Sequence, residues 1–126
     1  MSRPSSSARS SPTPLRSARS TRIVLTTAGS LSQARRLARQ LVRERGAACV
    51  NVVPRIESIY WWKGKVERGS EALLILKTTR PRLAHLCRRI KTLHPYEVPE
   101  ILVLPVAQGD PAYLRWLEES LMISVK

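Results

Sequence analysis

Residues 47–77 constrain the fold most, because they form two long extended segments around a single tight turn. The stretch reads AACVNVVPRIESIYWWKGKVERGSEALLILK. β-Branched and aromatic residues dominate both arms, as is typical of strands. Gly64 can adopt the positive φ that a tight hairpin turn needs. Since arms of about fifteen residues far exceed the usual strand of about five or six, we expect this hairpin to project from the globule and to meet a partner.

The two arms of the hairpin differ in their side-chain pattern. The apolar side chains of the first arm fall into two phases, one with Val50, Val52 and Ile56 and the other with Ile59 and Trp61. A slip between Pro54 and Ser58 predicts a bulge, and the missing N–H of Pro54 places this part of the arm at a sheet edge. In the second arm, residues 72–76 are apolar in both phases, which predicts a strand buried on both faces.

The remaining elements follow from start and stop signals along the chain. Residues 22–27 read as a short strand, and Ser30 with Gln33 fits a capping box that opens a helix. Gly46 is well placed to end that helix. A second helix opens at residues 79–81 and ends near His94, since the following proline disfavours helix. Residues 100–106 read as a fourth strand, residues 108–109 as a turn, and Asp110 as the N-cap of a third helix.

This order of elements predicts an α+β fold of the ferredoxin-like type. It is βαββαβ with a C-terminal helix, and right-handed crossovers place both main helices on one face of a four-stranded antiparallel sheet. The third and fourth strands are apolar on both faces, yet the helices cover only one, and the third helix is too short to cover the other. We therefore predict an obligate homo-oligomer whose hairpin reaches onto a neighbouring chain.

The chain is strongly basic, with a net charge of +13 over 126 residues. Such a charge is compatible with nucleic acid, phosphate ligands or an anionic surface. The arginines are spread over two helices, however, so a solvated exterior is the simpler interpretation, and no nucleic-acid reader motif is found. We expect one domain at residues 21–126 and a disordered extension rich in Arg, Ser and Pro at residues 1–20.

Composition also bears on the compartment. Two cysteines do not make a secreted disulfide scaffold, which favours a reducing, cytoplasmic setting. No apolar run approaches the roughly twenty residues that span a bilayer, so no membrane partner is expected. Because residues 1–20 are free of acids, an organellar transit peptide is the alternative.

Few side chains could bind a soft metal. The chain offers Cys49, Cys87, His85 and His94. His94 opens the stiff segment HPYEVP (residues 94–99, called the link here), which makes it the best ligand candidate; otherwise it is a hydrogen-bonded histidine that orders the link. Cys49, the second candidate, is alternatively a small apolar residue.

Two other groups of residues could contact ligands or partners. Tyr96 and Glu97 mark a possible cleft beside His94, although pairing with one of the abundant arginines is the simpler role for the carboxylate. The hairpin tip carries Tyr60, Trp61, Trp62, Lys63 and Lys65. Packing between subunits is the simpler role for the tip, and stacking on bases or binding an anion is the alternative. No nucleophile elbow, glycine-rich phosphate loop or metalloprotease spacing is present, so no enzyme is predicted.

Five segments resemble the CutA divalent-cation tolerance proteins. They are residues 47–51 (AACVN), 58–65 (SIYWWKGK), 71–78 (EALLILKT), 94–100 (HPYEVPE) and 113–116 (YLRW). The resemblance covers residues 22–121. It implies a ferredoxin-like fold and a homotrimer in which sheets pack inward and the hairpin is exchanged between subunits.

The resemblance also implies a function. Family members are associated with tolerance to divalent metals, copper among them. The copper ligands proposed for the family fall at Thr26, Leu93 and His94, and only His94 is a soft-metal ligand here. The architecture is similar to that of the trimeric PII signalling proteins, so a scaffold or sensor that binds a small anionic effector or a protein partner between subunits is the alternative.

Overall fold

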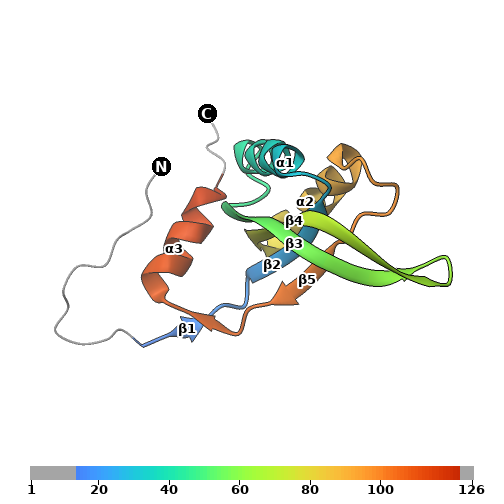
Figure 1. The fold of residues 1–126 in the computed structure, drawn as a ribbon. Coiled ribbons are helices and arrows are strands. Elements are labelled where there is room, and N and C mark those ends of the chain that lie inside the picture. Colours follow the sequence, from blue (N-terminus) through green and yellow to red (C-terminus); the bar gives the residue numbers. More distant parts are fainter. Residues whose placement is uncertain (1–13, 123–126) are drawn as a thin grey trace.

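The computed structural model describes residues 14–122, and residues 1–13 and 123–126 lie outside the described part (Figure 1). The helices are α1 (Leu31–Arg43), α2 (Arg80–Leu93) and α3 (Pro111–Ser120). The strands are β1 (Arg16–Ser17), β2 (Thr21–Ala28), β3 (Cys49–Trp62), β4 (Lys65–Thr79), β5 (Leu102–Pro105) and β6 (Gln108–Gly109).

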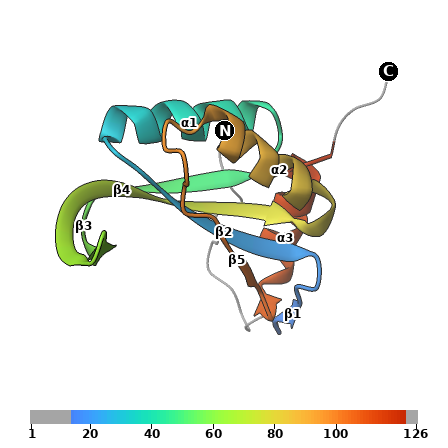
Figure 2. The same cartoon turned by 90° about the vertical axis from the view of Figure 1, so that its right-hand side faces the viewer.

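The main sheet has four antiparallel strands in the order β3-β4-β2-β5. Helices α1 and α2 lie together on one side of it, and α3 lies on the other side at one end (Figure 2). This arrangement confirms the predicted ferredoxin-like α+β fold. Strand β3 is at an edge, as the proline within it requires.

The hairpin has the expected turn and the expected bulge. Lys63 and Gly64 both have positive φ, 50° and 77°, as in the two-residue turn whose twist suits a hairpin. The strand register shifts between Val53 and Ile56. This extra residue reverses the phase of β3, so Ile56 lies on the opposite face from Val50, contrary to the sequence prediction.

Helix α1 begins as predicted but ends differently. The Gln33 N–H donates to Ser30 Oγ at 3.2 Å, whereas the Gln33 carboxamide does not reach back to complete the capping box. Arg45, not Gly46, takes the left-handed conformation after the helix, with φ of 59°. Gly46 serves a close approach instead, since a Cβ there would lie 3.3 Å from Leu86 Cδ1.

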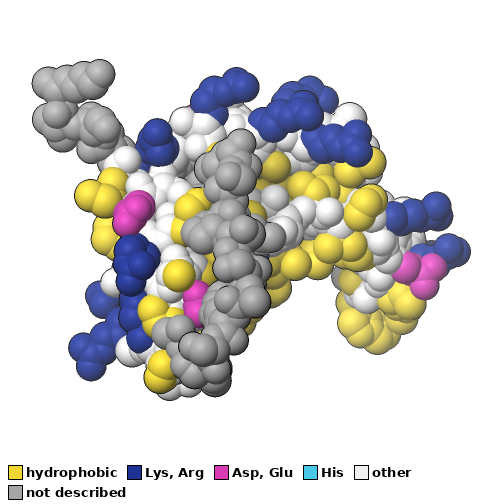
Figure 3. Space-filling view, turned by 90° about the vertical axis from the view of Figure 1, so that its left-hand side faces the viewer, with side chains coloured by type: hydrophobic (Ala, Val, Ile, Leu, Met, Phe, Trp, Pro, Cys, Tyr) yellow, Lys and Arg dark blue, Asp and Glu magenta, His cyan; other side chains and the backbone are white. Residues whose placement is uncertain are grey.

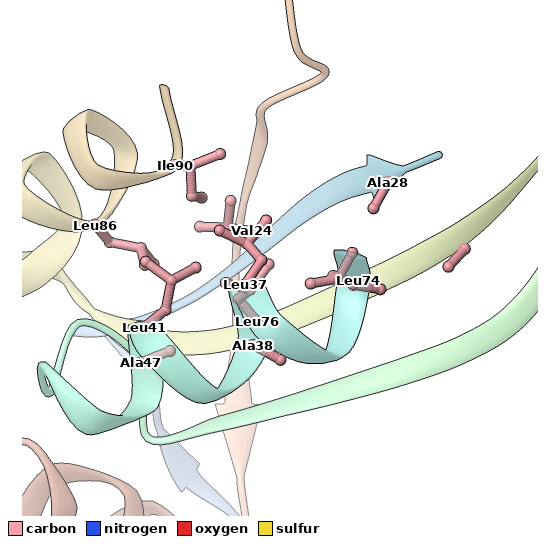
Figure 4. Close-up of a cluster of buried hydrophobic side chains, with 12 residues drawn as sticks. Val24, Ala28, Leu37, Ala38, Leu41, Ala47, Leu74, Leu76, Leu86 and Ile90 are labelled. Carbon is pink, nitrogen blue, oxygen red and sulfur yellow. The ribbon is translucent and has the colours of Figure 1, made fainter. Parts of the chain in front are cut away.

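The helix-covered face of the sheet holds the main core (Figure 4). Leucines at alternate positions of β4 point toward the helices, and Leu74 and Leu76 are fully buried. They meet side chains from β2, α1 and α2 that are also fully buried: Val24, Leu41, Leu86 and Ile90. This alternation follows from the two-residue period of a strand.

The opposite face, called the open face here, remains partly uncovered. Leu73 and Ile75 of β4 are only half-buried, and Leu102 and Leu104 of β5 are 55% and 45% exposed. Helix α3 covers one end of this face, where Leu117 and Leu121 pack against Ala48. Residues 72–76, predicted to be buried on both faces, therefore have one fully buried face within a single chain.

Ordered structure begins before the predicted boundary at residue 21. Strand β1 pairs with β6, which was predicted as a turn, through Arg16 with Gly109 and Ser17 with Gln108. Ala18 is 1% exposed, and Arg16 forms a 3.1 Å ion pair with Glu118 of α3. A two-residue strand has too little pattern to detect in the sequence. The predicted disordered extension therefore includes residues 16–17, which the structure shows as a strand.

Candidate functional site

A polar network joins the link to the base of the hairpin. The hydroxyl of Tyr96 donates to Glu71 Oε1 at 3.1 Å, and the hydroxyl of Ser58 donates to Glu71 Oε2 at 2.7 Å. Burial raises the pKa of Tyr96, and the negative charge of Glu71 raises it further. The network thus holds the link against both hairpin strands at the point where they leave the globule.

His94 is the buried end of this network, at 7% exposure. Its Nε2 lies 2.5 Å from the carbonyl oxygen of Thr27, and its Nδ1 accepts the Tyr96 N–H at 3.0 Å. Because a carbonyl only accepts and an N–H only donates, these partners select the neutral tautomer that is protonated at Nε2. The rings of His94 and Tyr96 lie 4.5 Å apart. Both ring nitrogens are therefore engaged, as expected for a histidine that orders the link.

The two predicted metal ligands lie far apart within one chain. Cys49 pairs with Lys77, which also pairs with Ile23. His94 binds the carbonyl of Thr27, four residues along β2 from Ile23. Four strand residues span about 13 Å, whereas donors to one metal lie within about 4 Å of each other. Cys49 and His94 of the same chain therefore cannot share an ion.

The other positions at which the family resemblance implies copper ligands do not add donors. Thr26 is fully buried under the helices, and Leu93 is an apolar side chain beside His94. Residues 14–122 contain no group of three or more His, Cys, Asp or Glu side chains that could hold a metal ion. A single chain therefore does not fit a soft-metal centre.

The cysteines and the second histidine lie outside the network. Cys49 is on the open face, and both cysteines are free thiols. Burial raises the pKa of Cys87, which keeps that thiol protonated. His85 is partly exposed on α2, 3.9 Å from Glu44.

A cavity of about 340 Å³ adjoins His94 on the side of α1. Its lining residues are Ala28, Leu37, Leu93 and Pro95, which are apolar, and Gln33, Arg36, Gln40 and His94. The Oε1 of Gln33 is buried and has no hydrogen-bond partner within residues 14–122. Of the predicted cleft residues, Tyr96 enters the network and Glu97 is exposed.

The hairpin tip is exposed in the single chain and forms the apolar lobe at the lower right of Figure 3. Trp61 and Trp62 are 74% and 59% exposed, and Lys63 Nζ lies 5.9 Å from the centre of the Trp62 ring. Tyr60 and Lys65 are exposed beside them. Such a surface is unusual for an isolated chain and typical of an interface.

Glu71, Ser58 and Gln33 were not predicted as site residues. The first two meet because the pairs Ile56 with Glu71 and Ser58 with Gly69, beyond the bulge, place Ser58 and Glu71 on one face of the hairpin. Counting alternate residues across residues 54–55 could not reveal that pairing. Gln33 was considered only as a capping residue, and its place beside His94 depends on the packing of α1 against the link.

Comparison with known proteins identifies close relatives. The family model described as CutA1 divalent ion tolerance protein matches residues 22–120. The divalent-cation tolerance protein CutA of Thermus thermophilus is 51% identical over 98 residues, 78% of this chain and 95% of that protein. The chloroplastic protein CutA 1 of rice (Oryza sativa) is 45% identical over 98 residues, 78% of this chain and 55% of its own length. The chain thus spans about half of the rice protein.

Solved structures agree with these relatives. CutA from Synechococcus elongatus has a TM-score of 0.84 at 36% identity, covering 86% of this chain and 96% of that one. CutA1 from rice has a TM-score of 0.80 at 43% identity, covering 83% of this chain and 96% of that one.

Proposed function

Since this chain belongs to the CutA1 divalent ion tolerance protein family, we propose that it is a non-catalytic homotrimer that contributes to divalent-cation tolerance. In this proposal the trimer binds a divalent metal ion, and copper is the first candidate. The family match over residues 22–120 carries this proposal. The family name describes ion tolerance and no reaction.

The open face and the hairpin tip support self-association. Both present apolar side chains to solvent in the single chain, and a second and third copy would bury them. The tip residues Tyr60, Trp61, Trp62, Lys63 and Lys65 are the interface residues of this proposal.

A shortened hairpin tests the role of the tip. Deleting residues 61–62 and 65–66 keeps the turn, and removing two residues from each arm preserves the face of every remaining side chain. We expect the variant to lose the trimer in size-exclusion chromatography with light scattering while retaining its folded circular-dichroism spectrum. A variant that stays trimeric with unchanged melting would show that the tip does not hold the assembly.

A metal held by the trimer would need donors from more than one subunit, because one chain lacks a suitable group within residues 14–122. Cys49 is on the open face, where a neighbouring chain would pack. His94 could coordinate only by giving up the Tyr96 N–H or the Thr27 carbonyl. We therefore propose Cys49 and His94 as metal ligands, with the remaining donor atoms provided by neighbouring subunits at the interface.

Copper titration tests this arrangement. Cu(II) is titrated into the wild type and into His94→Ala and Cys49→Ser, with His85→Ala as the control for adventitious binding to a surface histidine. We expect at least about tenfold weaker binding in the first two variants, as for the loss of one ligand, and no change in the control. Equal affinity in all four proteins would remove both residues from the metal site.

The alternative function is a sensor or scaffold that binds a small anionic effector or a protein between subunits. Tyr96, which contacts the base of the hairpin, and its neighbour Glu97 are the cleft residues of this alternative, and the net charge of +13 favours an anionic effector. Thermal-shift measurements with phosphorylated metabolites, on the wild type and on Tyr96→Phe, test it. Absence of stabilisation across the series would count against this function.

We also propose a cytoplasmic location, with an organellar one as the alternative if residues 1–20 act as a transit peptide. No helix within residues 14–122 is long and apolar enough to cross a membrane, and the rice relative named above is chloroplastic. Mass spectrometry of the N-terminus in cell extracts distinguishes the two, since a start near residue 20 would indicate cleavage. No specific nucleic-acid partner is proposed.

A further inference from the structure

Four arginines form a single stripe on the outer surface of α1. Successive helical residues are rotated by about 100°, so Arg35, Arg36, Arg39 and Arg43 all fall within about 100° of the helix circumference. All four are exposed, and basic side chains lie along the upper edge of the molecule in Figure 3. On α1 the arginines are thus solvent-exposed, as predicted, and lie on one face of the helix.

No described carboxylate neutralises this stripe. Helix α1 contains no acidic residue, and none of the four arginines forms an ion pair within residues 14–122. The nearest acid along the chain, Glu44, is bound by Arg89 through two 2.8 Å hydrogen bonds. Like charges at i, i+4 destabilise a helix. A bound anion would relieve this repulsion.

The stripe borders the cavity beside His94. A depression of about 350 Å³ is lined by Ser32, Arg35, Arg36, Arg39, Gln40 and Arg43. It shares Arg36 and Gln40 with the 340 Å³ cavity. The two form one groove along α1, apolar at the end near His94 and cationic at the other. Helix α1, whose residues line most of this groove, lies on the helix-covered side of the sheet (Figure 2).

The apolar end is lined by the Gln33 side chain. Its Oε1 is shielded from solvent and has no partner in residues 14–122, and since a buried acceptor normally requires a donor, a rotation of the carboxamide would present it to a ligand N–H. The nitrogens of His94 are both occupied by the protein, so this residue presents only its ring. A complementary ligand therefore has a flat apolar body, an N–H group for Gln33, and several negative charges for the arginines.

We propose that the α1 groove binds a nucleoside polyphosphate, with the base beside Gln33 and Leu37 and the phosphates on Arg36 and Arg39. A nucleobase supplies the flat body with N–H donors, and the phosphate chain supplies the charge. A nucleic-acid strand would use the arginine stripe but would not need the apolar end. The site lies within one chain, so it is distinct from a ligand site between subunits.

Calorimetry with metal-free protein in about 0.15 M salt tests the proposal with ATP, adenosine and inorganic triphosphate as probes. We expect one ATP per chain, bound at least about tenfold more tightly than either fragment. Arg36→Gln should weaken ATP binding at least about tenfold, as for a charge-assisted hydrogen bond, and Gln33→Leu should weaken ATP but not triphosphate.

Arg88→Gln is the matched control, because Arg88 is exposed on α2 and its loss changes the net charge equally. Equal weakening in Arg36→Gln and Arg88→Gln would reduce the effect to general charge and overturn the site. Triphosphate that binds as tightly as ATP, a single-stranded oligonucleotide that binds more tightly than ATP, or no ATP binding at 1 mM would each overturn the nucleotide assignment. Circular dichroism confirms that every variant is folded.

Discussion

The two faces of the main sheet carry similar apolar residues but differ in how completely they are covered. On the helix-covered face, Leu74 and Leu76 are fully buried by side chains of α1 and α2. On the open face, the intervening Leu73 and Ile75 are only half-buried. The chain thus completes one core by itself and leaves the second apolar face partly exposed, so in the proposed homotrimer the same substitution should affect folding on one face and assembly on the other.

The largest effect is expected on the covered face. Leu76→Ala removes a fully buried side chain and should lower the free energy of unfolding by about 3 kcal/mol. Urea denaturation followed by circular dichroism measures it. A loss below about 1 kcal/mol would mean that this face is not the closed core described above.

The next effect is expected on the open face. If the chain forms the proposed homotrimer, Ile75→Asp should abolish it, because about 2 kcal/mol of apolar burial per subunit is lost and a carboxylate enters the interface. Light scattering measures the mass, and Ile75→Val is the conservative control, which should stay trimeric. A trimeric Ile75→Asp protein would show that this face is not the interface.

A smaller effect is expected where the link meets the hairpin. Tyr96→Phe removes the 3.1 Å hydrogen bond to Glu71 and should cost about 1 kcal/mol. Ser58→Ala removes the other bond to the same carboxylate and serves as a comparison. Hydrogen exchange should rise at residues 94–99 in Tyr96→Phe but not in Ser58→Ala. Equal exchange in both would show that Tyr96 does not hold the link.

The smallest effect is expected at an ion pair between the helices on the covered face. The side-chain hydrogen bonds from Arg89 lower the pKa of Glu44 from 4.5 to about 2. A carboxyl whose pKa is lower in the folded state stabilises the protein above pH 4.5, and that stabilisation is lost as the pH falls toward 2. Glu44→Gln should therefore cost about 0.5–1 kcal/mol at pH 7.

A pH series provides the check on this pair. The difference in unfolding free energy between the wild type and Glu44→Gln should narrow steadily below pH 4.5. A difference independent of pH would assign the effect to packing rather than to the charge of Glu44.

Much of the fold could be predicted because its signals are local or periodic. The capping roles of Ser30 and Asp110, the turn at Lys63-Gly64 and the bulge after Val53 all follow from short sequence patterns and are confirmed. The relation to the CutA family, inferred from five short segments, is confirmed as well.

The parts that were missed depend on contacts between distant residues. Strand β1 forms because residues 108–109 offer it an edge, which no pattern in residues 14–20 indicates. Arg45 takes the left-handed position after α1, and Gly46 instead lies where Leu86 approaches closely. The partners of His94 are the backbone groups of Thr27 and Tyr96, and backbone partners leave no mark on residue identity.

The strand pairing beside the turn decides which way each tryptophan at the tip faces. Beyond the register shift, Trp61 pairs with Val66 and Trp62 with Lys65, so neighbouring rings point to opposite sides of the ribbon. A partner that buries both rings must therefore contact the tip on both faces of the hairpin, instead of packing against one face. Because the turn at Lys63-Gly64 fixes these pairs, deleting Arg55 should remove the bulge and leave both tryptophans on the sides that they face now.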